Sequence, residues 1–245
     1  MSLPIKVYRR LPRRFPKSLG FSKWALDFDG TDDRVEHADF GIAPLSSITL
    51  EAFVYTRSIG AGQYIFGFEG DPAVLMAITA DGDLYFWMWG TDDASYSQTA
   101  GITLSANRWY HLACIFDRPD LYMYRNGVEV WSGFLVDLDI SSRWVGENAE
   151  WIGMLGHYAS GPFNGIIDEP RAYSRALSLD ELHHNIINYH DPVRSGLILW
   201  DRFEEGQGTI AYDSSPTGNN GTLAPAGGPP EWSRRQKWEL RSVLG

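Results

Sequence analysis

The chain has 245 residues, of which 44% are hydrophobic and 14% aromatic, enough to bury the core of one large all-β domain or of two small ones. Its 25 glycines and 13 prolines are spread along the chain, which excludes a low-complexity polypeptide and favours many short strands joined by turns. No apolar run is long enough to cross a membrane, and prolines interrupt the N-terminal stretch where a secretory signal would carry its apolar segment.

The formal net charge of -10 is unevenly distributed along the chain. Residues 1–23 carry seven lysines and arginines and no acid, which leaves 14 basic against 31 acidic residues in the remainder. Such a basic arm can bind nucleic acid, an acidic surface or the acidic body of a neighbouring copy, or it can be a solvated terminus. Beyond this arm, the acidic chain is not expected to bind nucleic acid.

Patterns typical of β-strands follow the arm in close succession. Two short segments, 25–30 and 34–37, flank an acidic turn, and residues 48–55 alternate strongly between two faces. Further strands are predicted at 64–68, 74–78, 84–89, 109–116, 121–124, 128–131, 151–156 and 165–173. The pairs Asp81-Gly82 and Asn126-Gly127 are strong signals for hairpin turns.

Helical periodicity occurs once, at 178–184, where Ser178 is the expected N-cap and Glu181 completes a capping box. Two packed antiparallel sheets bury the apolar faces of so many strands and remove most of their edges. The sequence therefore predicts an all-β sandwich with one short helix. The single cysteine, Cys114, lies in the apolar run 112–116 and is expected to be a buried thiol.

Five segments, in the same order, resemble the laminin G-like, pentraxin-related group of the concanavalin A-like lectin and glucanase superfamily. They read LDFDGTDDRV at 26–35, SITLEAFV at 47–54, RWYHLA at 108–113, YRNGV at 124–128 and FNGIIDEPRAYSRALS at 163–178. The resemblance implies an antiparallel two-sheet jelly-roll sandwich over residues 24–190. Because this fold class is common in secreted proteins, an extracellular or virion-associated protein is expected, although no secretory signal is seen.

A block after the predicted helix resembles the family's first strand and loop, which normally precede the strand at 25–30. It reads LILWDRFEEG at 197–206, TIAYDSS at 209–215 and NNGTL at 219–223, within a C-terminal extension over 191–245. The extension can fold back on its own sandwich as a circularly permuted first strand, or it can be exchanged with a neighbouring copy and cause self-association. Folding back is favoured because it covers a sheet edge without a partner.

The acidic turn after the first strand supplies clustered carboxylates, and Ca²⁺ takes about six to eight oxygen ligands in proteins. In the resembled group, a structural calcium often lies between this turn and the aspartate of the closing strand. By that match, Asp29, Asp32 and Asp168 are the predicted metal ligands, and the ion would join the two ends of the domain. The alternative is a solvated turn whose carboxylates accept hydrogen bonds from backbone N–H groups.

The segment LYFWMW at 84–89 projects apolar side chains from both faces of its strand, so one face is core and the other is an aromatic stripe. The stripe can stack on sugar rings, or it can be covered by the arm, the exchanged strand or another subunit. Polar neighbours, including Gln98, would add hydrogen bonds to a sugar site. The predicted ligand-binding residues are Tyr85, Trp87, Trp89, Asp92 and Tyr96.

Three other groups carry weaker signals. The acidic residues around the hairpin 74–89 are explained by turn polarity: Asp81, Asp83, Asp92 and Asp93. An aromatic and polar cluster in the loops before the last strand has no specific spacing: Trp144, Trp151, His157 and Tyr158. The histidines near the helix lack matched ligands and are expected at the surface: His183, His184 and His190.

No catalytic pattern is found. Glycanases of this class carry Glu-x-Asp-x-Glu-type spacing, whereas Asp137 and Asp139 share a strand face without a third partner. A nucleophile elbow, a phosphate loop and zinc spacing are also missing. The sequence predicts a non-catalytic module that binds a glycan on a calcium-stabilised jelly roll. The alternative is a structural protein of a virion or surface layer, in which the basic arm and the displaced strand join copies.

Overall fold

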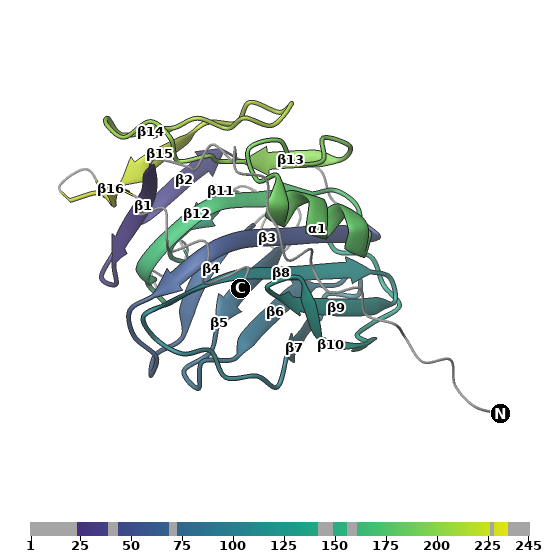
Figure 1. Cartoon of the computed structure of the whole chain (residues 1–245). Helices are drawn as coiled ribbons and strands as arrows, with labels where there is room; N and C mark the ends of the chain where they lie inside the picture. The colour runs from purple at the N-terminus through teal and green to yellow at the C-terminus, as the bar shows by residue number, and fades with distance from the viewer. Residues whose placement is uncertain are drawn as a thin grey trace.

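The computed structural model describes residues 24–38, 44–68, 73–141, 149–155, 161–225 and 228–234. They form two packed antiparallel β-sheets with one α-helix, α1 (Leu179–Ile187), on the outside (Figure 1). The predicted two-sheet jelly-roll sandwich is therefore confirmed. The basic arm 1–23 lies outside the described residues. Within the described part of the chain, no helix is long and apolar enough to span a membrane.

Each sheet contains eight described strands. Sheet A has the order β10-β9-β8-β3-β12-β1-β16, and β13 also pairs with β12. Its strands are β1 (Trp24–Asp29), β3 (Ser47–Thr56), β8 (Arg108–Asp117), β9 (Asp120–Arg125), β10 (Val128–Phe134), β12 (Asn164–Tyr173), β13 (Leu197–Trp200) and β16 (Glu231–Arg234). Sheet B has the order β14-β15-β2-β11-β4-β5-β6-β7. Its strands are β2 (Arg34–Ala38), β4 (Gln63–Phe68), β5 (Val74–Ile78), β6 (Leu84–Trp89), β7 (Ser95–Thr99), β11 (Ala149–Ile152), β14 (Ile210–Ala211) and β15 (Gly221–Ala224).

The main core lies between the sheets and follows from the alternation of their strands. In β6, every second side chain is buried, beginning with Leu84, and Phe86 stacks on Phe116 of the opposite sheet with ring centroids 6.4 Å apart. Cys114 of β8 is fully buried in the same core, and burial raises the pKa of its thiol. The expectation of a structural thiol agrees with this position.

Helix α1 covers the outer face of sheet A. It begins at the N-cap Ser178, and the predicted capping box with Glu181 is present. Its buried residues Leu182 and Ile186 join a second apolar cluster with Ala113 of β8. This helix therefore buries part of the outer face of sheet A.

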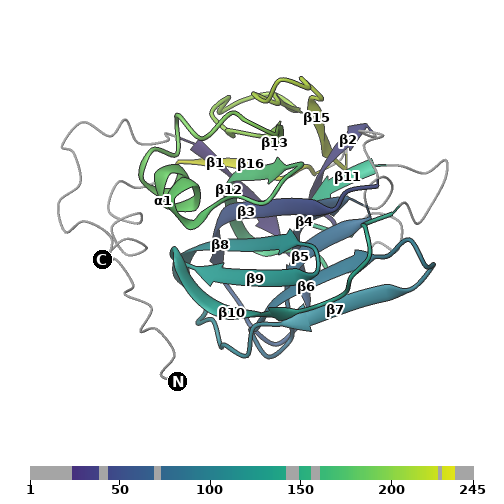
Figure 2. The same ribbon diagram turned by 90° about the vertical axis from the view of Figure 1, so that its right-hand side faces the viewer.

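The C-terminal extension lies on the sheets of its own chain. Strand β13 pairs with β12, β15 pairs with β2, and β16 pairs with β1. Figure 2 shows β16 beside β1 and β15 beside β2. Both N-terminal strands thus have a neighbour on each side, β1 between β12 and β16 and β2 between β11 and β15. Exchange of these strands between copies stays a prediction.

Two strands that the sequence does not indicate are β7 and β16. Strand β7 reads SYSQT and is a partly exposed edge strand, so it lacks the apolar alternation that marks a half-buried strand. Strand β16 is also an edge strand, and Trp232 is its one apolar residue. Pairing to β6 and to β1, respectively, holds these polar segments in extended form.

The position of β13 predicts that the C-terminal extension unfolds together with the rest of the sandwich. Leu199 is fully buried in the main core, so Leu199→Ala should lower the free energy of unfolding by about 2–5 kcal/mol. Urea unfolding followed by tryptophan fluorescence and circular dichroism measures this change. Ile210→Ala, at a position that is 36% exposed, is the control and should cost less than about 0.5 kcal/mol. An unchanged main transition, or a second separate one, would contradict a single cooperative unit.

Candidate functional site

The outer face of sheet B carries a row of aromatic side chains along β6. Tyr85, Trp87 and Trp89 alternate with buried core residues, and each is partly exposed. The rings of Trp87 and Trp89 lie 6.3 Å apart and are tilted by 36°. The structure therefore places these three predicted residues together on one face, and their role in binding a ligand stays a prediction.

This row continues across the neighbouring strands. Trp87 is the register partner of Leu75 in β5, Leu75 is the partner of Gly67 in β4, and Gly67 is the partner of Trp151 in β11. Paired residues of adjacent strands project to the same side of a sheet. Trp151 and Trp87 therefore stand on one face, with Gly67 and Leu75 between them.

A small, mainly apolar hollow opens beside Trp151. Tyr64, Gly67, Leu75, Trp151 and Met154 are among its lining residues. Trp151, which the sequence places both in the strand predicted at 151–156 and in the aromatic cluster before the last strand, lies in β11. The other members of that cluster lie outside the described residues: Trp144, His157 and Tyr158.

The structure corrects the predicted site at Asp92 and Tyr96. Tyr96 is the register partner of Met88, so its ring lies on the core side of β7 and packs against the main core. Its hydroxyl donates a hydrogen bond of 2.5 Å to Asp92, and a Cβ on Gly90 would meet both side chains. Asp92 and Tyr96 therefore lie at the inner rim and do not share a face with the stripe. The sequence did not indicate a strand at 95–99, so it could not show on which side of the sheet Tyr96 lies.

The charges near Trp151 are paired. The guanidinium of Arg34 in β2 lies 5.3 Å from the centroid of the Trp151 ring. Its Nε donates to Glu36 Oε1 at 2.7 Å, and its Nη1 donates to the carbonyl of Asp32 at 3.1 Å. Arg34 is the one lysine or arginine on the described strands of sheet B, so this face has no unpaired cation there.

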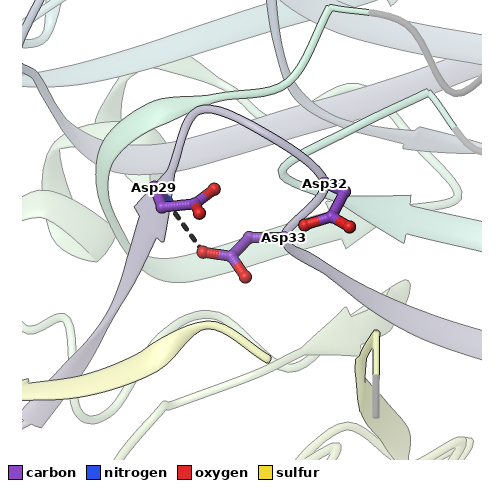
Figure 3. Close-up of side chains that lie close together, drawn as sticks. All are labelled: Asp29, Asp32 and Asp33. Atoms are coloured by element: carbon purple, nitrogen blue, oxygen red, sulfur yellow. Dashed lines mark hydrogen bonds between the residues drawn. The ribbon is translucent and has the colours of Figure 1, made fainter. Parts of the chain in front are cut away.

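The acidic turn between β1 and β2 brings together Asp29, Asp32 and Asp33 (Figure 3). Carboxylate oxygens from these residues lie within 4.8 Å of one another. Two of them also support the turn: Asp33 Oδ2 accepts a hydrogen bond from the backbone N–H of Asp29, and Asp29 Oδ1 accepts one from that of Thr31, each at 2.7 Å. The donor set is all oxygen and negatively charged, which fits a hard cation such as Ca²⁺.

Asp33 is the buried member of this group. Burial, together with the charges of Asp29, Asp32 and Asp27, raises its pKa to about 6, although the hydrogen bond from Asp29 acts in the opposite direction. A cation among these carboxylates would stabilise the charged form that burial disfavours. The turn was identified from the sequence, but Asp33 was not chosen as a ligand.

The structure also corrects the predicted ligand Asp168. Asp29 is the register partner of Asn164 in β12, and Asp168 lies four residues further along that strand. At about 3.3 Å per residue, the separation along the strand is about 13 Å. Asp168 is fully buried in sheet A and cannot join Asp29 and Asp32 around one ion. The motif match identified β12 as a strand, but it could not show which of its residues pairs with Asp29 of β1.

A family model described as the concanavalin A-like lectin/glucanases superfamily matches residues 29–183. The chain belongs to this superfamily. The C-terminal block that supplies β13, β14, β15 and β16 lies beyond the matched residues. No curated protein sequence matches the chain.

Solved structures show the same fold at low sequence identity. A candidate carbohydrate-binding protein from Bacteroides ovatus is 22% identical with a TM-score of 0.64, over 82% of this chain and 57% of that one. A heptameric SAP-like pentraxin from Limulus polyphemus is 14% identical with a TM-score of 0.53, over 80% and 97%. The CBM40 of Ruminococcus gnavus IT-sialidase, bound to α2,3 sialyllactose, is 18% identical with a TM-score of 0.50, over 63% and 95%. The chain thus spans little more than half the length of the Bacteroides protein.

In this member of the superfamily, the remaining polar clusters serve the fold. Asp83 accepts hydrogen bonds from the backbone N–H groups of Gly101 and Ile102, which agrees with a turn role for the second acidic set. The partner of His183 is a backbone group: its Nε2 lies 2.8 Å from the carbonyl oxygen of Gly127. Of the three histidines expected at the surface, His184 is exposed, and the other two are partly buried.

A buried ionic network under α1 was not predicted from the sequence. Arg171 donates to Glu51 at 3.1 Å and to Glu169 at 2.6 Å, and none of the three side chains is exposed. Asn185 of α1 donates to Glu51 at 2.8 Å, and the indole of Trp200 in β13 donates to Glu169 at 2.6 Å. The network therefore joins the helix and the C-terminal extension to sheet A.

The raised pKa of Asp33 predicts a pH-dependent stability in metal-free protein. The folded state holds this proton more tightly than the unfolded chain, whose aspartates titrate near 4. The resulting stability is fully present below about pH 4 and is lost as the pH rises through about 6. The free energy of unfolding of Asp33→Asn should therefore increase relative to that of the wild type across this window, by on the order of 1 kcal/mol because solvent partly screens the carboxylate.

Urea unfolding at a series of pH values, with a chelator present, measures this difference. Asp81→Asn changes an exposed acid in another turn and is the matched control. A constant difference between wild type and Asp33→Asn across the window would show that Asp33 does not titrate as described.

Proposed function

We propose that the chain is a non-catalytic carbohydrate-binding module whose glycan stacks on Tyr85, Trp87 and Trp89. The observation that carries the proposal is the row of three partly exposed aromatic side chains along one face of β6. Aromatic rings present a flat apolar surface with a polar edge, and exposed surfaces of this kind commonly mark contact sites. Strand β6 is paired on both sides, with β5 and β7, which holds its backbone in place and lowers the entropy cost of binding.

The chemistry of the neighbouring strands supports binding without catalysis. The four strands β4, β5, β6 and β7 contain no aspartate, glutamate or histidine. Glycoside hydrolysis ordinarily needs two carboxyl groups that flank the scissile bond. Within these four described strands, the platform offers surfaces on which a sugar chain can rest and no side chain that could act as a general acid or base.

The fold supports the same proposal. It is shared with the CBM40 structure that contains sialyllactose and with the candidate carbohydrate-binding protein from Bacteroides ovatus. Because these proteins are less than 25% identical to the chain, they indicate that this scaffold accommodates glycan sites in other proteins. The site itself is argued from the side chains of β6.

Truncation of the stripe tests the proposal. Trp87→Ala should abolish retention on a glycan array, because it removes the central ring of the row, and Trp87→Phe should retain part of the binding. Phe134→Ala is the matched control, since this aromatic side chain is 67% exposed and lies on β10 of sheet A. Absence of any retained glycan for the wild type, or equal retention by Trp87→Ala, would refute the proposal.

We also propose that Ca²⁺ binds the turn formed by Asp29, Asp32 and Asp33 and acts as a structural ion. Binding to the folded state alone raises stability by about 2.7 kcal/mol when the free ion is at about 100 times its Kd. The melting temperature should therefore rise with Ca²⁺ and fall with chelator, and Asp32→Asn should abolish the shift. Asp93→Asn, in the exposed turn before β7, should leave it intact. Equal melting temperatures in Ca²⁺ and chelator would leave the carboxylates as caps of the turn.

A further inference from the structure

We propose that the ligand is an uncharged oligosaccharide that lies across the strands of sheet B, from Trp87 to Trp151. This inference rests on the proposed function and specifies the length, direction and charge of the glycan. Its starting point is the register row that links β11, β4, β5 and β6 on the outer face of the sheet.

The distance between the two indoles sets the length of the ligand. Trp151 and Trp87 lie on strands that are three steps apart in sheet B. With strands about 4.8 Å apart, the two aromatic platforms are separated by about 14 Å. A single sugar ring on Trp87 cannot reach Trp151, whereas a chain of about three or more linked rings spans this distance.

The surface between the two platforms is apolar. Gly67 has no side chain, and a Cβ added there would lie 2.5 Å from the Cβ of Leu75, so no larger residue fits. Leu75 itself is only 7% exposed. The hollow lined by Tyr64, Gly67, Leu75 and Trp151 opens beside this surface. The proposed trough is the apolar strip between the two indoles, which runs perpendicular to the strands.

The charges on this face select an uncharged ligand. Strands β4, β5, β6 and β7 carry no charged residue. Arg34, the one lysine or arginine on the described strands of sheet B, is paired with Glu36 and with the carbonyl of Asp32. The turn that contains Asp29, Asp32 and Asp33 lies directly before β2, next to Arg34, and adds negative charge there. On the described strands of this face, a carboxylated or sulfated sugar would meet no unpaired lysine or arginine, and the acidic turn would repel it.

A comparison of two glycan series tests this inference. Neutral oligosaccharides of increasing length and carboxylated oligosaccharides of the same lengths are measured against the full chain by calorimetry, after selection of neutral binders on an array. Affinity should increase up to about three or four linked sugars, in line with the separation of the indoles, and the carboxylated series should bind more weakly.

Variants of the two platforms separate this inference from the proposed function. Trp151→Ala should weaken the longer neutral ligands about tenfold or more and leave the shortest ones unchanged, whereas Trp87→Ala should weaken both. Trp151→Phe keeps an aromatic ring and should lose less, and Phe134→Ala is the control. Melting temperatures establish that each variant is folded.

Each failure has a distinct meaning. If the wild type binds no glycan, the proposed function fails. If the wild type binds through Trp87, but Trp151→Ala behaves like Phe134→Ala or affinity does not increase with length, the trough is refuted and the function stands. Tighter binding of the carboxylated series would overturn the uncharged ligand.

Discussion

The rest of the structure depends on the buried guanidinium of Arg171. Its partners come from four places: Glu51 in β3, Glu169 in β12, the carbonyl of Tyr189 after α1, and the ring of Trp200 in β13. A buried charge is costly unless every partner is in place, so the network requires the helix and the C-terminal extension to dock together on sheet A. Burial alone would raise the pKa of Glu51, but the hydrogen bond from His111 and the charge of Arg171 hold it below its ordinary value.

As a result, the outer faces of sheet A and sheet B differ in what covers them. Part of the outer face of sheet A is used for internal packing, since α1 and the chain that follows it bury its polar network and its apolar clusters. Sheet B has partly exposed aromatic side chains on its outer face and a hollow beside Trp151. The outer face of sheet B, where the glycan site is proposed, is therefore separated from the helix and the ionic network by the thickness of the sandwich.

Alternation within a strand predicts which side chains share a face, and for Tyr85, Trp87 and Trp89 this was sufficient. It does not predict which strands are neighbours or in what register they pair. Trp151 reaches the row of Trp87 through β4 and β5, which no local pattern shows. The same limit explains the prediction for Asp168. The motif match placed this residue near Asp29, whereas the register of β12 pairs Asp29 with Asn164. Buried charges such as Glu51 and Arg171 are hidden for a related reason, because they resemble the exposed positions of a half-buried strand until a helix covers them.

The pairing of β1 with β16 has a mechanical consequence. Trp24 and Arg234, the first and last described residues, are register partners on adjacent antiparallel strands. A force applied between the two ends would load the hydrogen bonds of this pair one at a time and open them like a zipper. The described part of the molecule should therefore yield easily to tension applied between Trp24 and Arg234.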